Sequence, residues 1–437
     1  MKQICNLHIV YTEQNEGYSQ VMNRNSDSAE TQEQVNWLFL DLNSYFASVE
    51  QQMNPKLRGK PVAVVPMIAD STCCIAVSYE AKKFGVKTLT TVREARRLCP
   101  EITFISGNHN NYIEYHHKII ATVENCIHVT AVMSIDEMAC ELIGSERKIP
   151  KATEIANKIK QRIRAEVGEV LTCSIGLAPN RFLAKVASDM QKPNGLTTIL
   201  PSTIKSNLLK LKLRDLPGIG HNMEVRLNKF GIREMSQLLD LSKKDLAGIW
   251  GGINGERFYE LLLGRQLPEI ETTRGSFSHS HVLPPDLRNG AGAYAVAQKL
   301  VHKLGVRLRK NNYWCQELFL SIRFIDGSKW TERQGFSEVQ DNFTLLRAFQ
   351  KMWVKRPKKS SPPVKIGVWI DKLVPNDLHN FSFFENQKLN TLSHSMDAIN
   401  DKFGRNAIYF GGIETTKKAF PVRIAFSNIP EVDEEED

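Results

Sequence analysis

The chain has 437 residues, enough for three or four domains, because a single hydrophobic core seldom grows beyond roughly 250 residues. Apolar residues make up 42% and charged residues 24% of the chain, values near the averages for soluble globular proteins, so a largely disordered or collagen-like chain is excluded. The formal net charge of +9 fits a polyanionic partner, although a basic surface that only confers solubility explains the charge equally well.

The first half of the chain predicts an α+β domain that follows a polar segment. Residues 1–36 are rich in Gln, Asn, Ser and Glu, so we expect them to form an N-terminal arm. From Trp37 onward strands alternate with helices up to about Ile199. The strands are predicted at 37–42, 62–65 and 73–77, and the helices at 44–53 and 79–85. These strands are too short and too dispersed for a Rossmann sheet.

The second half predicts two further units. Residues 201–265 are mostly helical, and the Thr-, Gly-, Ser- and His-rich segment 272–281 is typical of a linker. The third unit is expected to contain helices at 293–310 and 345–354 and strands such as 318–325. The run K-R-P-K-K at 355–359 fits a nuclear signal or a basic loop, and we favour the loop because the run lies between a helix and a strand.

Acidic residues follow two apolar strands. Asp41 closes the strand W-L-F-L-D, and Asp136 and Glu137 follow the apolar run V-T-A-V-M-S-I. If these strands are neighbours in one sheet, the three carboxylates converge, and their mutual repulsion favours a hard cation such as Mg²⁺. Two such ions can activate an attacking hydroxyl and stabilise a leaving phosphate. Taken separately, however, an acid such as Asp41 is more often a turn residue, and a pair such as Asp136 and Glu137 is more often solvated.

Several segments, in order along the chain, resemble the Y-family translesion DNA polymerases of the UmuC and DinB group. The similarity extends over about 37–415. The segments are F-L-D-L-N-S-Y-F-A-S-V-E at 39–50, R-G-K-P-V-A-V at 58–64, V-S-Y-E-A-K-K-F-G-V at 77–86, S-I-D-E at 134–137, C-S-I-G-L-A-P-N-R-F-L-A-K-V-A-S-D-M-Q-K-P-N-G at 173–195 and L-P-G-I-G at 216–220. Coincidence in one motif is plausible, whereas coincidence in all of them is not.

The resemblance implies an α+β multidomain fold shaped like a right hand. It has a palm, small fingers, a helical thumb with a helix-hairpin-helix, and a β-sheet little finger. The implied boundaries are an arm at 1–36, palm at 37–44 and 109–200, fingers at 45–108, thumb at 201–270, little finger at 276–415, and a tail at 416–437 that is acidic at its end.

The resemblance also implies a two-metal site and a selector of the nucleotide sugar. Asp41, Asp136 and Glu137 would be the catalytic metal ligands, and the backbone carbonyl of Leu42 would complete a site for two Mg²⁺ ions. The dNTP-binding residues would include Tyr45 and Phe46. The ring of Phe46 falls at the family's steric gate, where it would clash with a 2′-hydroxyl. Without the family, Phe46 is simply a core ring.

Basic residues at two places are expected to bind the triphosphate. Tyr79, Lys82 and Lys83 share one face of a short helix because they are three and four residues apart. Many family members carry Arg at the position of Lys82, so this chain would neutralise phosphate there as a point charge rather than bind it in a bidentate manner. Lys192 matches another triphosphate-contacting lysine of the family. Each lysine by itself is also consistent with a solvated surface charge.

Three segments are expected to bind DNA or a protein partner. Pro217, Gly218, Ile219 and Gly220 match the thumb's helix-hairpin-helix, in which backbone N–H groups approach a DNA phosphate. Residues 276–430, with 23 basic against 12 acidic residues, would contain the little finger that lies along the duplex. Asn380–Phe384 is a degenerate version of a sliding-clamp peptide, and a core strand is an equally good interpretation.

Together these features predict a template-directed, low-fidelity DNA polymerase for translesion synthesis in DNA repair. Its partners would be primer-template DNA, dNTP, a sliding clamp and a UmuD-like protein. A polymerase-shaped, non-catalytic adaptor is the first alternative, and a nucleotidyl cyclase with a palm is the second. Eight scattered cysteines and the lack of an apolar run of roughly 18 residues indicate a reducing compartment and no membrane. The cytoplasm and nucleoid of a bacterium, or the nucleus of a eukaryote, fit this description.

Overall fold

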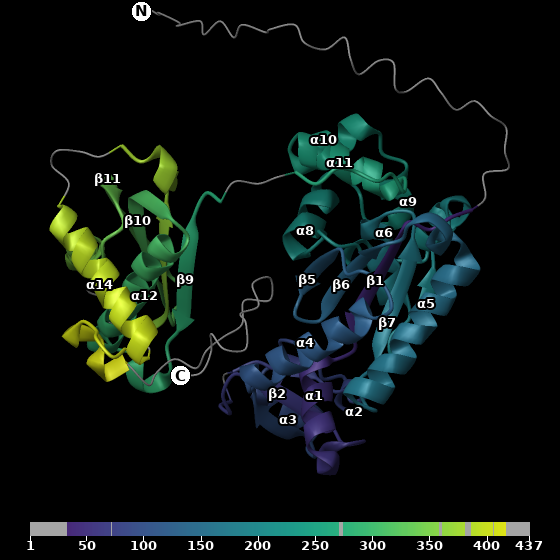
Figure 1. The fold of residues 1–437 in the computed structure, drawn as a ribbon, viewed down its shortest axis with the longest axis horizontal. Helices are drawn as coiled ribbons and strands as arrows, with labels where there is room; N and C mark the ends of the chain where they lie inside the picture. Colours follow the sequence, from purple (N-terminus) through teal and green to yellow (C-terminus); the bar gives the residue numbers. More distant parts are fainter. Residues whose placement is uncertain are drawn as a thin grey trace, which may run out of the picture. The chain divides into compact units, whose positions relative to one another are not determined.

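A computed structural model describes residues 33–70, 72–270, 274–357, 361–380, 386–404 and 406–416 (Figure 1). The chain divides into two compact units, one ending at Leu267 and the other beginning at Pro268. Within the described ranges, no helix combines the length and the apolar character needed to cross a membrane.

A five-stranded sheet forms the expected palm. In spatial order its strands are β5 (Ala131–Ser134), β6 (Glu137–Glu141), β1 (Trp37–Leu42), β7 (Cys173–Ala178) and β8 (Leu196–Thr198). The central strand β1 pairs antiparallel with both β6 and β7 and is buried along its whole length, which explains its nearly continuous apolar sequence.

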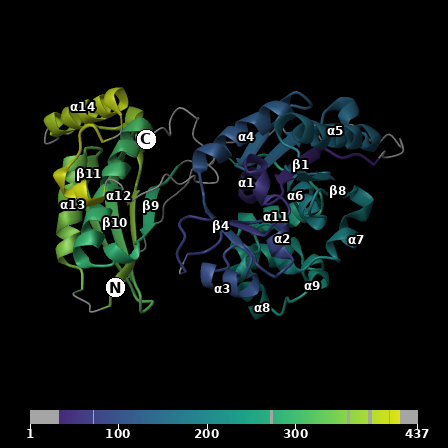
Figure 2. The same ribbon diagram turned by 90° about the horizontal axis from the view of Figure 1, so that it is seen from below.

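Helices cover both faces of the palm sheet. Helices α4 (His109–Glu124) and α5 (Ile149–Arg162) lie on one face, and α6 (Arg181–Met190) lies on the other (Figure 2). Helix α6 approaches the sheet closely at Gly176, where an added Cβ atom would lie 2.0 Å from the carbonyl oxygen of Ala184. The glycine therefore permits this helix–sheet contact.

The palm begins before Trp37. Gln34 forms an isolated bridge with Lys148, and Val35 is fully buried with its N–H donating to the carbonyl of Arg147 at 3.1 Å. Residues 33–36 thus belong to the folded domain rather than to the polar arm that was predicted.

A second, three-stranded sheet in the order β3-β2-β4 forms the expected fingers. Its strands and the helices beside it are α1 (Tyr45–Met53), β2 (Val62–Val65), β3 (Ala76–Val77), α2 (Tyr79–Lys82), α3 (Val92–Leu98) and β4 (Thr103–Ser106). The strand predicted at 73–77 is confirmed only for its last two residues. The helix predicted at 79–85 ends at Lys82, and Gly85 follows in the left-handed conformation with φ of +85°.

The region expected to be the thumb is helical and shares a core with the palm. Its helices are α7 (Ile204–Leu208), α8 (His221–Lys229), α9 (Met235–Leu239), α10 (Lys243–Trp250) and α11 (Ile253–Leu262). Trp37 and Phe39 of β1 pack in the same apolar cluster as Leu216 and Ile219. Thumb and palm are therefore joined by continuous hydrophobic packing.

The second unit is an antiparallel sheet covered by helices on one face. Its strands, in spatial order, are β11 (Lys329–Val339), β10 (Tyr313–Phe324), β12 (Pro363–Asp371) and β9 (Phe277–Val282). A short strand, β13 (Val374–Pro375), also pairs with β10, and the helices are α12 (Gly290–Lys310), α13 (Asn342–Val354) and α14 (Gln387–Phe403). The prediction of a linker at 272–281 is wrong from Phe277 onward, because alternate residues there turn into the core and form β9.

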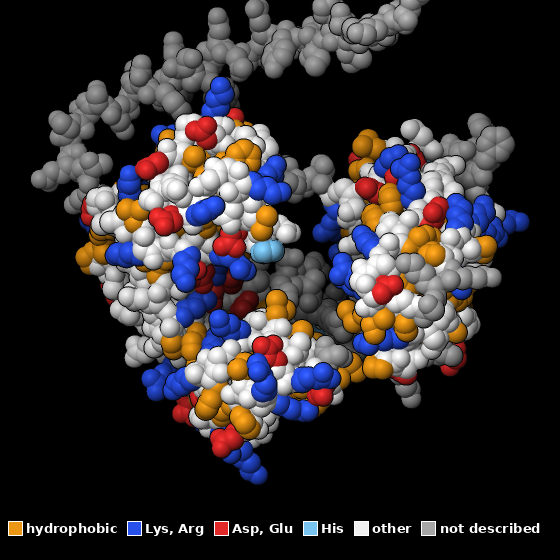
Figure 3. Space-filling model, turned by 180° about the vertical axis from the view of Figure 1, so that it is seen from behind, with side chains coloured by type: hydrophobic (Ala, Val, Ile, Leu, Met, Phe, Trp, Pro, Cys, Tyr) orange, Lys and Arg blue, Asp and Glu red, His pale blue; other side chains and the backbone are white. Residues whose placement is uncertain are grey.

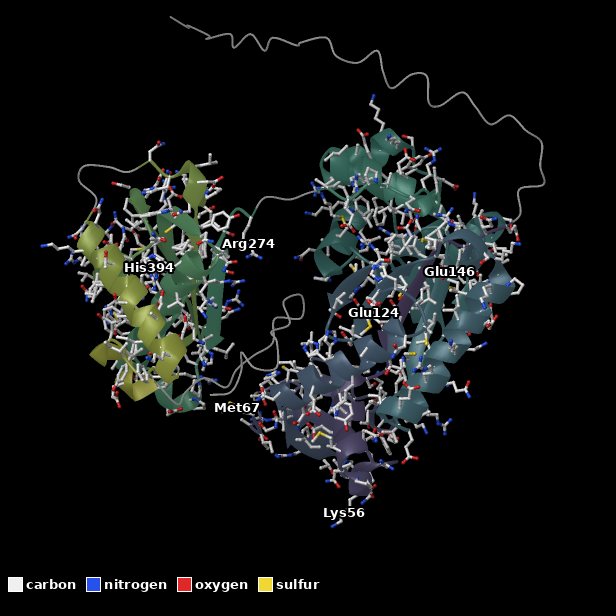
Figure 4. The ribbon with its side chains drawn as sticks, viewed as in Figure 1. Lys56, Met67, Glu124, Glu146, Arg274 and His394 are labelled. Atoms are coloured by element: carbon white, nitrogen blue, oxygen red, sulfur yellow. The ribbon has the colours of Figure 1, made fainter. Side chains whose placement is uncertain are left out.

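Charged side chains hold the second unit together and mark its surface. The guanidinium of Arg309, on α12, makes a bidentate ion pair with Asp397 of α14, at 2.6 and 2.9 Å. Arg274, labelled in Figure 4, lies just before β9, and its guanidinium stands 5.0 Å from the ring centroid of Phe277.

Candidate active site

Asp41 and Glu137 lie opposite each other on neighbouring strands. They are register partners in the antiparallel pair β1–β6, at the end of β1 and the beginning of β6. Trp37, Phe39 and Asp41 alternate onto the face of the sheet that α6 covers, because side chains of a strand share a face at every second residue. Asp41 is only 5% exposed. Two of the three predicted carboxylates, Asp41 and Glu137, therefore lie opposite each other at neighbouring strand ends.

Asp136 lies in the turn that precedes β6. The N–H of Leu42 donates to its backbone carbonyl at 2.9 Å, and the hydroxyl of Ser134 donates to its carboxylate at 2.6 Å. Burial raises the pKa of Asp136, and the hydrogen bond from Ser134 opposes this effect. His116 supports the turn through Nδ1, which donates to the carbonyl of Ile135 at 2.7 Å, and burial lowers the pKa of His116 to about 4, so its ring is neutral.

Two lysines neutralise the acids. Lys185 Nζ lies 2.5 Å from Asp41 Oδ2 and 2.7 Å from Glu137 Oε1, and Lys192 Nζ lies 2.7 Å from Asp41 Oδ1. Both lysines also pair with Asp189. Burial lowers the pKa of Lys185, but the neighbouring carboxylates raise it by more, and the pKa of Lys192 is raised in the same way. Both ammonium groups are therefore charged at neutral pH.

Helix α6 positions Lys185. Its N-cap Asn180 accepts a hydrogen bond from the N–H of Leu183 at 2.8 Å. Lys185 and Asp189 are four residues apart on the helix and so share one face. Helix α6 packs on the face of the palm sheet that bears Asp41. The side of α6 that carries Lys185 and Asp189 therefore lies next to Asp41 and Glu137.

Buried Asn43 fixes the segment that follows α6. Its side-chain amide donates to Ser174 Oγ at 3.1 Å, and its carbonyl oxygen accepts hydrogen bonds from the N–H of Asn194 at 2.7 Å and from the hydroxyl of Thr172 at 3.1 Å. The segment beginning at Lys192 is thereby tied to β1 and β7.

The predicted nucleotide-binding helix contributes two of its three residues to this region. Lys82 Nζ donates to Ser44 Oγ at 2.8 Å and lies 4.1 Å from the centroid of the Tyr79 ring. Burial lowers the pKa of Lys82, and the charge of Lys192 lowers it further. A bound anion would relieve this repulsion between the two ammonium groups. Lys83 is exposed at the end of the helix.

Tyr45 and Phe46 are both buried. The hydroxyl of Tyr45 donates a hydrogen bond to the carbonyl of Tyr112 at 2.7 Å. The hydroxyl is therefore engaged in a hydrogen bond within the core. The ring of Phe46 is 4% exposed and stacks on the ring of Tyr112, with centroids 4.2 Å apart and planes at 14°. The ring of Phe46 therefore packs in the core, as one of the two interpretations predicted. Its role as a steric gate stays a prediction.

The hairpin at Pro217–Gly220 leads into α8. Gly218 has φ of +89°, and Gly220 is the N-cap of α8. A Cβ atom added to either glycine would meet no atom within 4 Å, so the backbone here faces open space. Ile219, by contrast, is buried in the core shared with the palm and anchors the turn. Its side chain is therefore structural.

Acidic side chains lie in a hollow of the first unit. Figure 3 shows Asp and Glu side chains at the bottom of this hollow, with Lys and Arg side chains around it. This distribution is suited to a ligand that combines a metal ion with phosphates.

Comparison with known proteins identifies the family. The profile described as "impB/mucB/samB family" matches residues 40–189, its C-terminal domain matches 274–383, and "DNA polymerase-iota, thumb domain" matches 214–265. DNA polymerase IV 1 of Halalkalibacterium halodurans is 31% identical, over 87% of this chain and 95% of that protein. DNA polymerase IV of Bacillus velezensis is 30% identical, over 86% and 92%. The chain belongs to the Y family of DNA polymerases.

Solved structures agree with this assignment. A Y-family DNA polymerase chimera of Dbh and Dpo4 superimposes with a TM-score of 0.63 and 25% identity, over 78% of this chain and 99% of that one. The predictions of a Y-family translesion DNA polymerase, and of its multidomain fold, are thus confirmed.

Y-family polymerases use divalent metal ions, and the residues at the palm edge have suitable donors. Asp41, Asp136 and Glu137 supply hard carboxylate oxygens, and the burial of Asp136 and Glu137 disfavours their charge unless a cation compensates it. Among the residues that the structure describes, no three His, Cys, Asp or Glu side chains are grouped closely enough to hold a metal ion. Lysine ammonium groups take that neutralising role in this arrangement.

Sequence reasoning missed Lys185 and Asn43. Lys185 carries a partial signal, because it lies four residues before Asp189 and the two therefore share one face of α6. Asn43 carries no such signal, because its role depends on a hydrogen bond with residue 194, far along the chain.

Proposed function

We propose that this Y-family polymerase extends a DNA primer at the edge of the palm sheet, with Asp41, Asp136, Glu137 and the Leu42 carbonyl holding two Mg²⁺ ions. The observation that carries the proposal is the register of Asp41 against Glu137, with Asp136 beside them and two charged lysines in contact. When bound, the ions would activate the primer 3′-hydroxyl and stabilise charge on the phosphates.

The basic side chains would bind and orient the triphosphate. Lys82 and Lys192 lie on the fingers and palm respectively, and the charge of Lys192 lowers the pKa of Lys82. A triphosphate between them would relieve that repulsion and place its charge against both ammonium groups. Lys185, which contacts Asp41 and Glu137, would hold those carboxylates in orientation before cations enter.

Primer extension on undamaged and abasic templates tests the proposed activity. Template-dependent addition of dNTPs, with continued synthesis past the abasic site, is the expected result. A non-catalytic adaptor would bind the same primer-template without extending it. The presence of all three acids and both lysines at the palm edge favours catalysis over this alternative.

Phe46→Leu should raise the ratio of NTP to dNTP incorporation by about tenfold or more, because a flat ring beneath the sugar is replaced by a narrower side chain. The leucine keeps much of the volume that fills the contact with Tyr112. The measurement is single-nucleotide insertion with matched NTP and dNTP. Phe258→Leu, at a buried ring in the thumb, is the control for lost stability. Unchanged sugar discrimination in Phe46→Leu would assign this ring to the core alone.

The open face of the little-finger sheet carries a row of cations. Arg323 is the register partner of Lys329 on one side and of Lys365 on the other, and all three are exposed. They line a depression of about 230 Å³ that also includes Trp369. Three adjacent like charges repel one another, so this row is suited to a phosphate backbone.

Replacing Arg323, Lys329 and Lys365 together with Gln should weaken primer-template binding and reduce the slope of log K against log[salt] by roughly 2 to 3, because each phosphate contact releases counterions. Fluorescence anisotropy across a salt series measures both effects. The same change at Lys56, Lys151 and Lys158, which are exposed in the first unit, should leave the slope nearly unchanged. Equal losses in both triple variants would contradict a specific role for the row.

A sliding clamp remains a proposed partner. The predicted peptide Asn380–Phe384 lies outside the described residues except for Asn380. Its adjacent rings Phe383 and Phe384 could anchor in an apolar groove of a clamp. A UmuD-like partner and association with the nucleoid rest on the family resemblance alone.

A further inference from the structure

The thumb carries an apolar groove whose lining contains none of the residues proposed to bind metal, nucleotide or DNA. Its walls include Ile204, Leu239, Leu241, Tyr259 and Leu263, and its volume is about 240 Å³. Leu263 is 47% exposed, and the aliphatic side chains beside it continue into the thumb core. A concave apolar surface of this kind is typical of a site for a short anchored peptide.

The described chain begins at the mouth of this groove. Ser202, one of the lining residues, donates a hydrogen bond through its hydroxyl to the carboxylate of Glu33. Gln34 then bridges to Lys148 and fixes the next residue to the palm. The point at which residues 1–32 join the described chain, Glu33, therefore lies beside the groove.

The sequence of residues 1–32 divides into an apolar part and an acidic part. Apolar side chains are densest in the first 11 residues, at Ile4, Leu7, Ile9, Val10 and Tyr11, and are sparser in residues 12–32, at Tyr18, Val21 and Met22. Residues 12–32 hold four acidic residues against one basic residue. Twenty-one residues behaving as a flexible linker span roughly 25 Å, so the apolar part can reach a groove beside Glu33.

Charge also favours binding of the N-terminal segment to the thumb. Lys205 lines the groove and is exposed, and residues 201–267 hold 11 basic against 7 acidic residues. An acidic connecting segment is attracted to such a surface. A tethered peptide also has an effective concentration in the millimolar range, so even weak apolar contacts suffice for binding.

We propose that the thumb groove binds residues 4–11 of the same chain. The groove provides the apolar surface, the contact of Ser202 with Glu33 places the tether, and the acidic residues 12–32 cross a basic thumb. The N-terminal arm is thereby held on the thumb as a docked segment.

Hydrogen exchange on the full chain tests this docking. Amides of α9 and α11 should exchange about tenfold more slowly in the full chain than in a chain lacking residues 1–32. A tenfold slowing is expected if residues 4–11 bind the groove with a dissociation constant of about a tenth of their effective concentration. Leu263→Arg in the full chain should remove the difference. Leu209→Arg is the matched control, because Leu209 is a thumb leucine with 46% exposure that does not line the groove. Absence of a difference, or equal effects of the two variants, would overturn the proposal.

A cross-linking experiment separates the chain's own segment from other occupants. A photoreactive phenylalanine analogue replaces Leu7, and isotopically heavy and light chains are mixed in equal amounts before irradiation. We expect the analogue at position 7 to cross-link to peptides within 235–263. In each cross-link both peptides should carry the same label, heavy with heavy or light with light. Cross-links that join heavy with light chains would show that a second copy occupies the groove, and cross-links elsewhere would show that residues 4–11 do not bind it. Either result would contradict docking within one chain.

Discussion

Asp41→Asn should lower the rate of dNTP addition by at least about 10³-fold while leaving primer-template affinity within a few-fold of normal. A loss of this size corresponds to roughly 4 kcal/mol in the barrier, which is expected when a group that stabilises the reacting phosphates is removed. Asp41 is buried at the meeting point of two lysines and faces Glu137 across the strand pair. Asp136→Asn and Glu137→Gln should behave in the same way. Single-turnover extension and anisotropy binding measure the two quantities.

Asp189→Asn is the control for these substitutions. Asp189 pairs with both Lys185 and Lys192, at 3.2 and 2.8 Å, so it belongs to the same ion-pair network, but it lies on α6 rather than at a strand end. Its replacement should cost less than about tenfold in rate, because the proposed metal-holding carboxylates remain. Near-normal extension by any variant of the three strand-end acids, or an equal loss in Asp189→Asn, would mean that the ion-pair network and not a metal site explains the acids.

Gly176→Ala should abolish extension and destabilise the first unit by several kcal/mol. The new methyl group would lie 2.0 Å from the carbonyl oxygen of Ala184 and 2.5 Å from the N–H nitrogen of Ser188, both backbone atoms of α6. The helix would have to move away from the sheet, and overpacking of this kind typically costs about 1 to 3 kcal/mol or more. Because α6 carries Lys185, the displacement also separates that lysine from Asp41.

Gly335→Ala is the matched substitution for this test. Gly335 also lies within a strand, but an added Cβ atom would have its nearest neighbour at 4.0 Å, the carbonyl oxygen of Gln316. Thermal melting should therefore show a clear drop for Gly176→Ala and little change for Gly335→Ala. A Gly176→Ala protein with normal melting and normal extension would show that the close approach of α6 is dispensable.

The acidic edge could be predicted because its cause is local. Asp41 ends an apolar strand and Asp136 and Glu137 follow another, so the pairing of these strands in one sheet was enough to place Asp41 opposite Glu137. The strand at Phe277–Val282 could not be recognised, since its inward positions include His279 and His281, and its outward positions include Ser278 and Ser280. Its apolar alternation is therefore weak, and only pairing with β12 reveals it.

The lysine partners depended on long-range packing. Lys185 meets Asp41 across 144 positions of sequence, and that contact follows from how α6 lies on β1, which local patterns do not specify. Phe46 is a second example. Its position on a helix was predicted, but its stacking on Tyr112 joins α1 to α4, and this contact decides how buried the ring is.

Anomalous scattering from Mn²⁺ in crystals of the polymerase with primer-template DNA and a non-hydrolysable dNTP shows directly whether the palm edge binds the metal ions for nucleotide addition. The predicted result is anomalous density at Asp41, Asp136 and Glu137, lost in crystals of Asp41→Asn prepared in the same way. Well-ordered DNA and nucleotide with no anomalous density at these three carboxylates would contradict a metal site at the palm edge.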